Sequence, residues 1–171
     1  MLILLRWQHE RGNSHDIKSL LSLAQTIARG IPGEASAQLI RDTHYGLAAV
    51  ANETNDKQAC LYHTQTLLTT GRMHQEQTGT TDLRLAIAYN EYAIALVMNH
   101  DFENAITHFE TAIGIYKSLT DYWPGMDTNP RTNMGFSLWA LGRYDEAFAM
   151  LEALLRDREV KFGVMDRESY R

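Results

Sequence analysis

The feature that most constrains this chain is an internal repeat. Residues 89–105 and 131–147 align without a gap, at an offset of 42 residues (135 against 93). The matched pairs are Ala93 with Gly135, Leu96 with Leu138, Phe102 with Tyr144, and Ala105 with Ala147. A weaker third copy lies upstream, where Ala48 and Cys60 match Ala93 and Ala105 at an offset of 45 (105 against 60). Repetition at such a period indicates stacked supersecondary units that share one core.

Each copy has the pattern of an antiparallel helical hairpin. A small residue in each of its two apolar stretches lets two helices cross closely, and large apolar residues fill the space around the crossing. Short polar turns, His100-Asp101 and Gly142-Arg143, would join the two helices. Apolar residues recur at spacings of three and four in both stretches, which is the period of an amphipathic helix. A hairpin of this kind buries its apolar surface by stacking on its neighbours.

The pattern predicts about eight helices and no strand. Asp101 is expected to cap one helix with its carboxylate, and Pro130 to occupy the first position of the next helix. Gly30, Pro32 and Gly33 would separate the first two hairpins. The predicted helices span residues 2–10, 15–29, 35–54, 57–71, 80–99, 102–119, 130–142 and 144–161.

These residues resemble the tetratricopeptide repeat family. The most specific stretch is 140–147, Ala-Leu-Gly-Arg-Tyr-Asp-Glu-Ala, and Phe102, Ala105, Phe109 and Ala112 fit the same pattern. Leu154 and Arg131 depart from it, at the last small and the first large position. The 42-residue spacing is similar to the variant found in kinesin light chains and in large fungal multidomain proteins. The resemblance implies an all-α α-solenoid of antiparallel helical hairpins, a right-handed superhelix, over the whole chain. Its repeats would span residues 1–32 (degenerate), 36–78, 81–123 and 128–171.

Composition narrows the function further. The net charge of −5 and the lack of a Lys/Arg cluster argue against nucleic-acid binding. After Met1 only four residues are apolar, too few for a membrane span or a signal peptide, so no membrane role is expected. Cys60 is the single cysteine, which excludes an internal disulfide and suggests a reducing, cytoplasmic compartment. Both ends look like half a repeat, so the sequence suggests a segment of a longer array.

No catalytic, cofactor or metal site is expected. The seven histidines lack the His-x-x-x-His spacing of a helical metal site, and His44 and His63 are isolated in the sequence. Cys60 has His63 three residues further on, the one arrangement that suggests a nucleophile, but it occupies the small position of its repeat, where a thiol packs well. The segment 30–33 lacks the lysine and hydroxyl residue of a phosphate-binding loop. The sequence therefore predicts a protein without chemistry of its own.

The resemblance implies a partner-binding groove lined by the first helix of each hairpin. Asparagine amides in this groove can donate to and accept from a peptide backbone, and the apolar residues can take its side chains. The expected groove residues are Tyr45, Asn52, Asn90, Ile94, Met98, Asn133, Phe136 and Trp139. Phe136 and Trp139 have an equal alternative, which is packing on a further repeat.

The expected function is a scaffold that binds a protein or peptide. Neighbouring repeats of a longer array or a self-association contact are further candidate partners. One subclass of the family clamps a terminal carboxylate with groove Lys and Arg, but of the matching positions only Asn133 fits, which excludes that activity. An alternative function is a regulatory or sensor array of a STAND-type signalling NTPase whose nucleotide module is absent from this chain.

Overall fold

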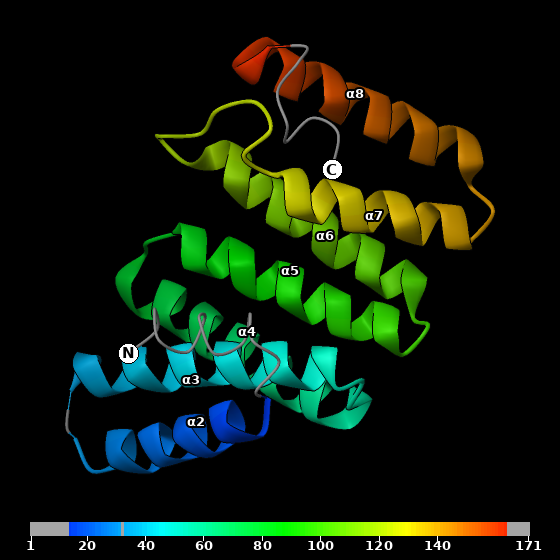
Figure 1. The fold of residues 1–171 in the computed structure, drawn as a ribbon. Coiled ribbons are helices and arrows are strands. Elements are labelled where there is room, and N and C mark those ends of the chain that lie inside the picture. The colour runs from blue at the N-terminus through cyan, green and yellow to red at the C-terminus, as the bar shows by residue number, and fades with distance from the viewer. Residues whose placement is uncertain (1–13, 32, 164–171) are drawn as a thin grey trace. The chain divides into compact units, whose positions relative to one another are not determined.

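A computed structural model describes residues 14–31 and 33–163, and all regular elements in these ranges are α-helices (Figure 1). The predicted helix at 2–10 lies outside the described residues. The all-α class expected from the repeat is confirmed. The helices are α2 (Ser14–Arg29), α3 (Glu34–Glu53), α4 (Lys57–Thr78), α5 (Leu83–Met98), α6 (Phe102–Ser118), α7 (Thr128–Ala140) and α8 (Tyr144–Phe162).

The chain divides between Gly79 and Thr80 into two compact units, which are described separately. In the first unit α3 packs against both α2 and α4. In the second unit each helix packs on the next from α5 to α8, and α5 also contacts α7. The second unit therefore contains two successive hairpins, α5–α6 and α7–α8.

Four helix ends differ from the predicted ones by more than one residue, and one of these is the end of α7, at Ala140 and not at residue 142. Helix α4 continues past residue 71 and ends at Gly79, which has the left-handed φ of 68° that stops a helix cleanly. Helix α5 begins at Leu83 and not at residue 80, because the Asp82 carboxylate accepts a hydrogen bond from the Leu85 N–H at 3.0 Å. Helix α7 begins at Thr128, so Pro130 is its third residue. Proline is tolerated there because first-turn N–H groups have no partner within the helix.

Asp101 occupies the predicted N-cap position of α6, but the predicted role of its carboxylate is wrong. Asp101 precedes α6, but its carboxylate caps no backbone N–H. Both carboxylate oxygens instead accept from the Asn104 amide nitrogen, at 2.8 and 3.0 Å. The Asn104 side chain therefore occupies the carboxylate oxygens that were predicted to accept from backbone N–H groups of the first turn.

The turns inside the three hairpins repeat the same backbone geometry. Asn55, His100 and Gly142 all have a positive φ, of 53°, 62° and 77°. In each turn the N–H of the next residue donates to a carbonyl five residues back, at 2.8, 3.0 and 2.9 Å. The three positions are 45 and 42 residues apart (100 against 55, 142 against 100), the offsets that the sequence alignment gave. The repeat register is therefore visible in the backbone itself.

The small residues of the repeat were predicted to lie at the helix crossings, which requires them to be buried. All are buried: Ala48, Cys60, Ala93, Ala105, Gly135 and Ala147. In the first unit the core is built from Ile17 and Leu21 of α2 with Leu47 and Val50 of α3. In the second unit Phe109 is fully buried, at 0% exposure. Burying side chains of this size supplies the main stabilisation of each unit, because removing apolar area from water is favourable.

Two ion pairs of Arg131 stabilise the end of the connection between α6 and α7. Arg131 donates to Asp127, the N-cap residue of its own helix, at 3.1 Å and to Asp157 of α8 at 2.6 Å. Asp127 is completely buried, and the bond to its Oδ2 offsets part of the cost of removing this charge from water, while its Oδ1 accepts no hydrogen bond among the described residues. The two ion pairs join the start of α7 to the second half of α8.

Candidate protein-interaction face

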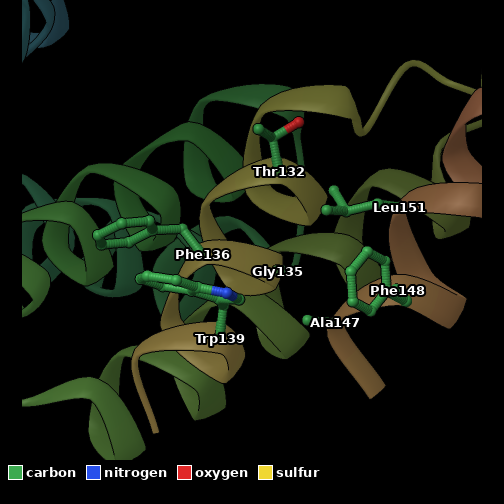
Figure 2. Close-up of a pocket in the computed structure, with 7 residues that line it drawn as sticks. All are labelled: Thr132, Gly135, Phe136, Trp139, Ala147, Phe148 and Leu151. Atoms are coloured by element: carbon green, nitrogen blue, oxygen red, sulfur yellow. The ribbon is translucent and has the colours of Figure 1, made fainter. Parts of the chain in front are cut away.

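The last hairpin, α7 with α8, carries an apolar groove on its surface. The groove has a volume of about 260 Å³, and all of its lining residues except Thr132 are apolar or glycine. Gly135 and Ala147 lie between Phe136 and Trp139 of α7 on one side and Phe148 and Leu151 of α8 on the other, as Figure 2 shows. We use the term end face for this groove together with the other exposed apolar side chains of the stripe on α8, which are Tyr144, Leu155 and Phe162.

Large apolar side chains of the end face are open to solvent. Phe136 is 53% exposed, Trp139 56% and Phe148 64%. The floor is tight, because a Cβ added to Gly135 would lie 3.1 Å from the Leu151 side chain. Because Gly135 has no side chain, Leu151 of α8 can pack against α7 at this point. The exposed side chains of Phe136, Trp139 and Phe148 therefore form the rim of a narrow groove.

Aromatic rings continue from the groove along one side of the second unit. Phe136 and Trp139 are stacked with ring centroids 6.5 Å apart. Phe136 also meets Phe102 of α6 at 6.4 Å, and Trp139 meets Tyr144 of α8 at 6.2 Å. These contacts hold the two exposed rings in place, and preordered aromatic side chains lose little conformational entropy when a partner covers them.

The repeat shows what normally covers this kind of surface. At the 42-residue offset, Phe148 and Leu151 correspond to Ile106 and Phe109 of α6. Those two side chains are only 5% and 0% exposed, and α7 packs on the helix that carries them. The second hairpin of the unit therefore exposes positions that the first hairpin buries beneath a helix.

The eight residues predicted to line a groove fall into different environments. Tyr45 and Asn52 are exposed on α3, in the first unit. On α5, Asn90 is buried and Ile94 and Met98 are half-buried. On α7, Asn133 is half-buried, while Phe136 and Trp139 are exposed and adjoin each other. Of the eight, Phe136 and Trp139 line the groove, together with residues of α8.

Asn90 has a polar environment of its own. Its amide nitrogen donates to the Glu91 carboxylate at 3.1 Å, while its buried Oδ1 accepts no hydrogen bond among the described residues. Burial raises the pKa of Glu91, and the hydrogen bond from Asn90 opposes that rise. With 5% of its surface exposed, Asn90 has little access to a peptide backbone.

The structure joins two histidines that look isolated in the sequence. His44 of α3 and His63 of α4 have their Nδ1 atoms 3.0 Å apart, and Gln25 of α2 reaches His44 Nε2 at 2.8 Å. Burial, with the cation of Arg29 second, lowers the pKa of His44. Burial, followed by His44 and Lys18, lowers the pKa of His63 to about 4, against a small opposing effect of Asp56. No group of three or more metal-ligating side chains occurs in the described part of the chain.

The α8 residues of the end face were missed as site residues. Phe148, Leu151 and Leu155 lie on the apolar stripe of the last helix, a pattern that indicates a packing surface but does not show what covers it. In the structure they are 64%, 39% and 37% exposed. The alignment with Ile106 and Phe109 could have identified these positions. A following helix packs on α6, whereas no helix is described after α8, so the matching side chains of α8 are exposed.

Comparison with known proteins gives a match at the level of structure. No family model matches the sequence, and no curated protein matches it either. Among solved structures, the crystal structure of BtubC (BKLC) from P. vanneervenii is similar to this chain with a TM-score of 0.75 and 18% sequence identity. The match covers 96% of this chain and 64% of the BtubC chain, so this chain spans less than two thirds of that protein's length.

None of the described helices is long and apolar enough to cross a lipid bilayer. The helical hairpins, the repeated turn geometry and the match to BtubC agree with one another. This chain has the α-solenoid fold of a kinesin-light-chain-like tetratricopeptide protein.

Proposed function

We propose that this chain is a non-catalytic scaffold that binds a protein or peptide partner. The observation that carries the proposal is the exposed aromatic pair, Phe136 and Trp139, at an apolar groove. Monomeric proteins rarely expose large contiguous apolar patches unless a partner covers them. Helical-repeat folds of this kind typically serve in protein interaction.

The chemistry of the groove suits an apolar side chain. A groove of about 260 Å³ with one hydroxyl at its edge offers no charge to hold a charged small molecule. Buried aromatic anchors contribute most of the binding energy in many protein interfaces. We therefore assign Phe136 and Trp139 as the main contacts, with Ile94 and Met98 of α5 as secondary contacts. Asn90 is given no direct role because it is buried.

The proposal is tested with a peptide selected from a random display library against the full chain. Isothermal titration calorimetry then compares its affinity for the wild type and for the Phe136→Ala, Trp139→Ala double variant. We expect a loss of at least about tenfold, since truncating a central aromatic contact costs about 1 kcal/mol or more.

A matched control is Tyr62→Ala, which removes an aromatic side chain 62% exposed on α4, in the other unit. Its affinity should equal that of the wild type. Equal affinity in the Phe136, Trp139 double variant, with unchanged helical circular dichroism, would show that the face was assigned wrongly.

A further inference from the structure

We propose that the end face pairs with the same face of a second copy of this chain, with the two α8 helices antiparallel about a twofold axis. The inference rests on the proposed function in taking the end face as a protein-interaction surface. It goes further by naming the occupant.

An apolar stripe runs along the exposed side of α8, with Arg158 and Glu159 between its last two members. Its members recur at helical spacing and are all exposed by more than a third: Tyr144, Phe148, Leu151, Leu155 and Phe162. The spacings of four, three, four and seven residues place them on one side of the helix. Ala147 and Leu154 lie along one edge of the stripe and are buried.

The preceding hairpin shows that this stripe has the form of a helix-binding surface. Its counterparts in α6 are Phe102, Ile106, Phe109 and Ile113, and none of these is exposed. Helix α7 packs on α6 in that hairpin. The surface on α8 therefore has a shape that accepts a helix lying along it, which a second α8 supplies.

The exposed area is close to what a stable dimer needs. The five stripe residues with Phe136 and Trp139 are seven large side chains, each between 37% and 64% exposed. Side chains of this size bury about 150–250 Å² each when fully covered, so the patch amounts to roughly 600 Å². Two copies would bury roughly 1,200 Å² in total, the lower end of the range for specific interfaces.

The stripe is complementary to itself when reversed. An axis level with Ala153 sets Leu151 opposite Leu155 of the second copy and Tyr144 opposite Phe162 of the second copy. Glu152 and Arg156 lie on one flank of the stripe, four residues apart. In two antiparallel helices related by a twofold axis, matching flanks lie side by side. Glu152 of each copy then approaches Arg156 of the other, so the charges attract across the contact.

Sedimentation equilibrium of the full chain tests this directly. We expect a dimer at high micromolar concentration that dissociates on dilution. Leu155→Glu places a charge beside the twofold axis, opposite Leu151 of the second copy, and should weaken dimerisation by at least about 30-fold, the effect of losing a central contact. Val160→Glu is the matched control, because Val160 is 85% exposed on α8 but off the stripe, and it should dimerise as the wild type does.

The charge pair gives a second, independent test of the register. Glu152→Arg and Arg156→Glu should each weaken the dimer, because they set like charges opposite each other, and the combined variant should restore it. A wild-type monomer at high micromolar concentration, or a Leu155→Glu variant that dimerises as well as the wild type, would overturn the inference. The proposed function would survive either result, because peptide binding by Phe136 and Trp139 is measured separately.

Discussion

Acid should destabilise the first unit through its buried histidine pair. The Gln25 amide nitrogen is a donor, so His44 Nε2 accepts from it, and the His44 Nδ1 proton is left to bond His63 Nδ1. A further proton on His63 Nδ1 would break this bond. The arrangement joins α2, α3 and α4 only while both rings are neutral, in agreement with their lowered pKa values.

The direction of the effect follows from proton binding. The pKa of His63 is about 4 in the folded chain and 6.5 as its ordinary value. Between these values the unfolded chain binds more protons, so the free energy of unfolding falls as pH decreases through that window. From pH 7.5 to 5.0 the pKa difference corresponds to about 2 kcal/mol. Because the ring is only half-buried, solvent screening reduces the expected loss to about 1 kcal/mol.

Urea unfolding followed by circular dichroism at pH 7.5 and pH 5.0 measures this loss. The His63→Gln variant keeps a polar side chain without a titrating ring, so its pH dependence should be smaller by about 1 kcal/mol. If the wild type and His63→Gln lose the same stability between the two pH values, the histidine pair does not carry the effect and the reasoning is refuted.

Two further predictions concern the repeat register. Ala147→Arg forces a long charged side chain into the α7–α8 crossing, where Ala147 is 3% exposed, and should lower the free energy of unfolding by about 3 kcal/mol or more. A variant as stable as the wild type in urea would contradict the register. His100→Gly should stabilise by about 1 kcal/mol, because a side chain at positive φ is strained, whereas Gly142→Ala should destabilise by about 1 kcal/mol. Thermal unfolding distinguishes these two signs, and equal shifts of the melting temperature would refute the shared turn geometry.

The fold was predictable because the repeat specifies it locally. Small residues at fixed spacing place the helix crossings, and the turns follow at the same offsets. The predicted ends failed where a single side chain or backbone angle decides the outcome. Asp82 starts α5 with one hydrogen bond, and Gly79 ends α4 by adopting a left-handed φ, while Gly71 lies within the helix. Propensity does not distinguish these two glycines, because both are compatible with a helix end.

The candidate site was only partly predictable. Phe136 and Trp139 were expected on a binding surface, with packing on a further repeat as an equal alternative, and their exposure agrees with both. Asn90 was expected to contact a ligand, but its helix turns it into the interior. Phe148 and Leu151 were not among the predicted site residues, because an amphipathic pattern shows which side of a helix is apolar and not what covers it. Contacts between distant residues, such as His44 with His63, require the fold to be known first.

The central claim is that a partner docks on the apolar face of α7 and α8. Backbone amide NMR of the full chain, with and without the selected peptide, tests it most directly. To keep self-association from masking the peptide, the spectra are recorded at low protein concentration. We expect the shifted amides to concentrate between Thr132 and Leu155, with the Trp139 indole N–H among the largest shifts. Shifts that concentrate in α2 to α4, with the α7–α8 amides unmoved, would contradict the account.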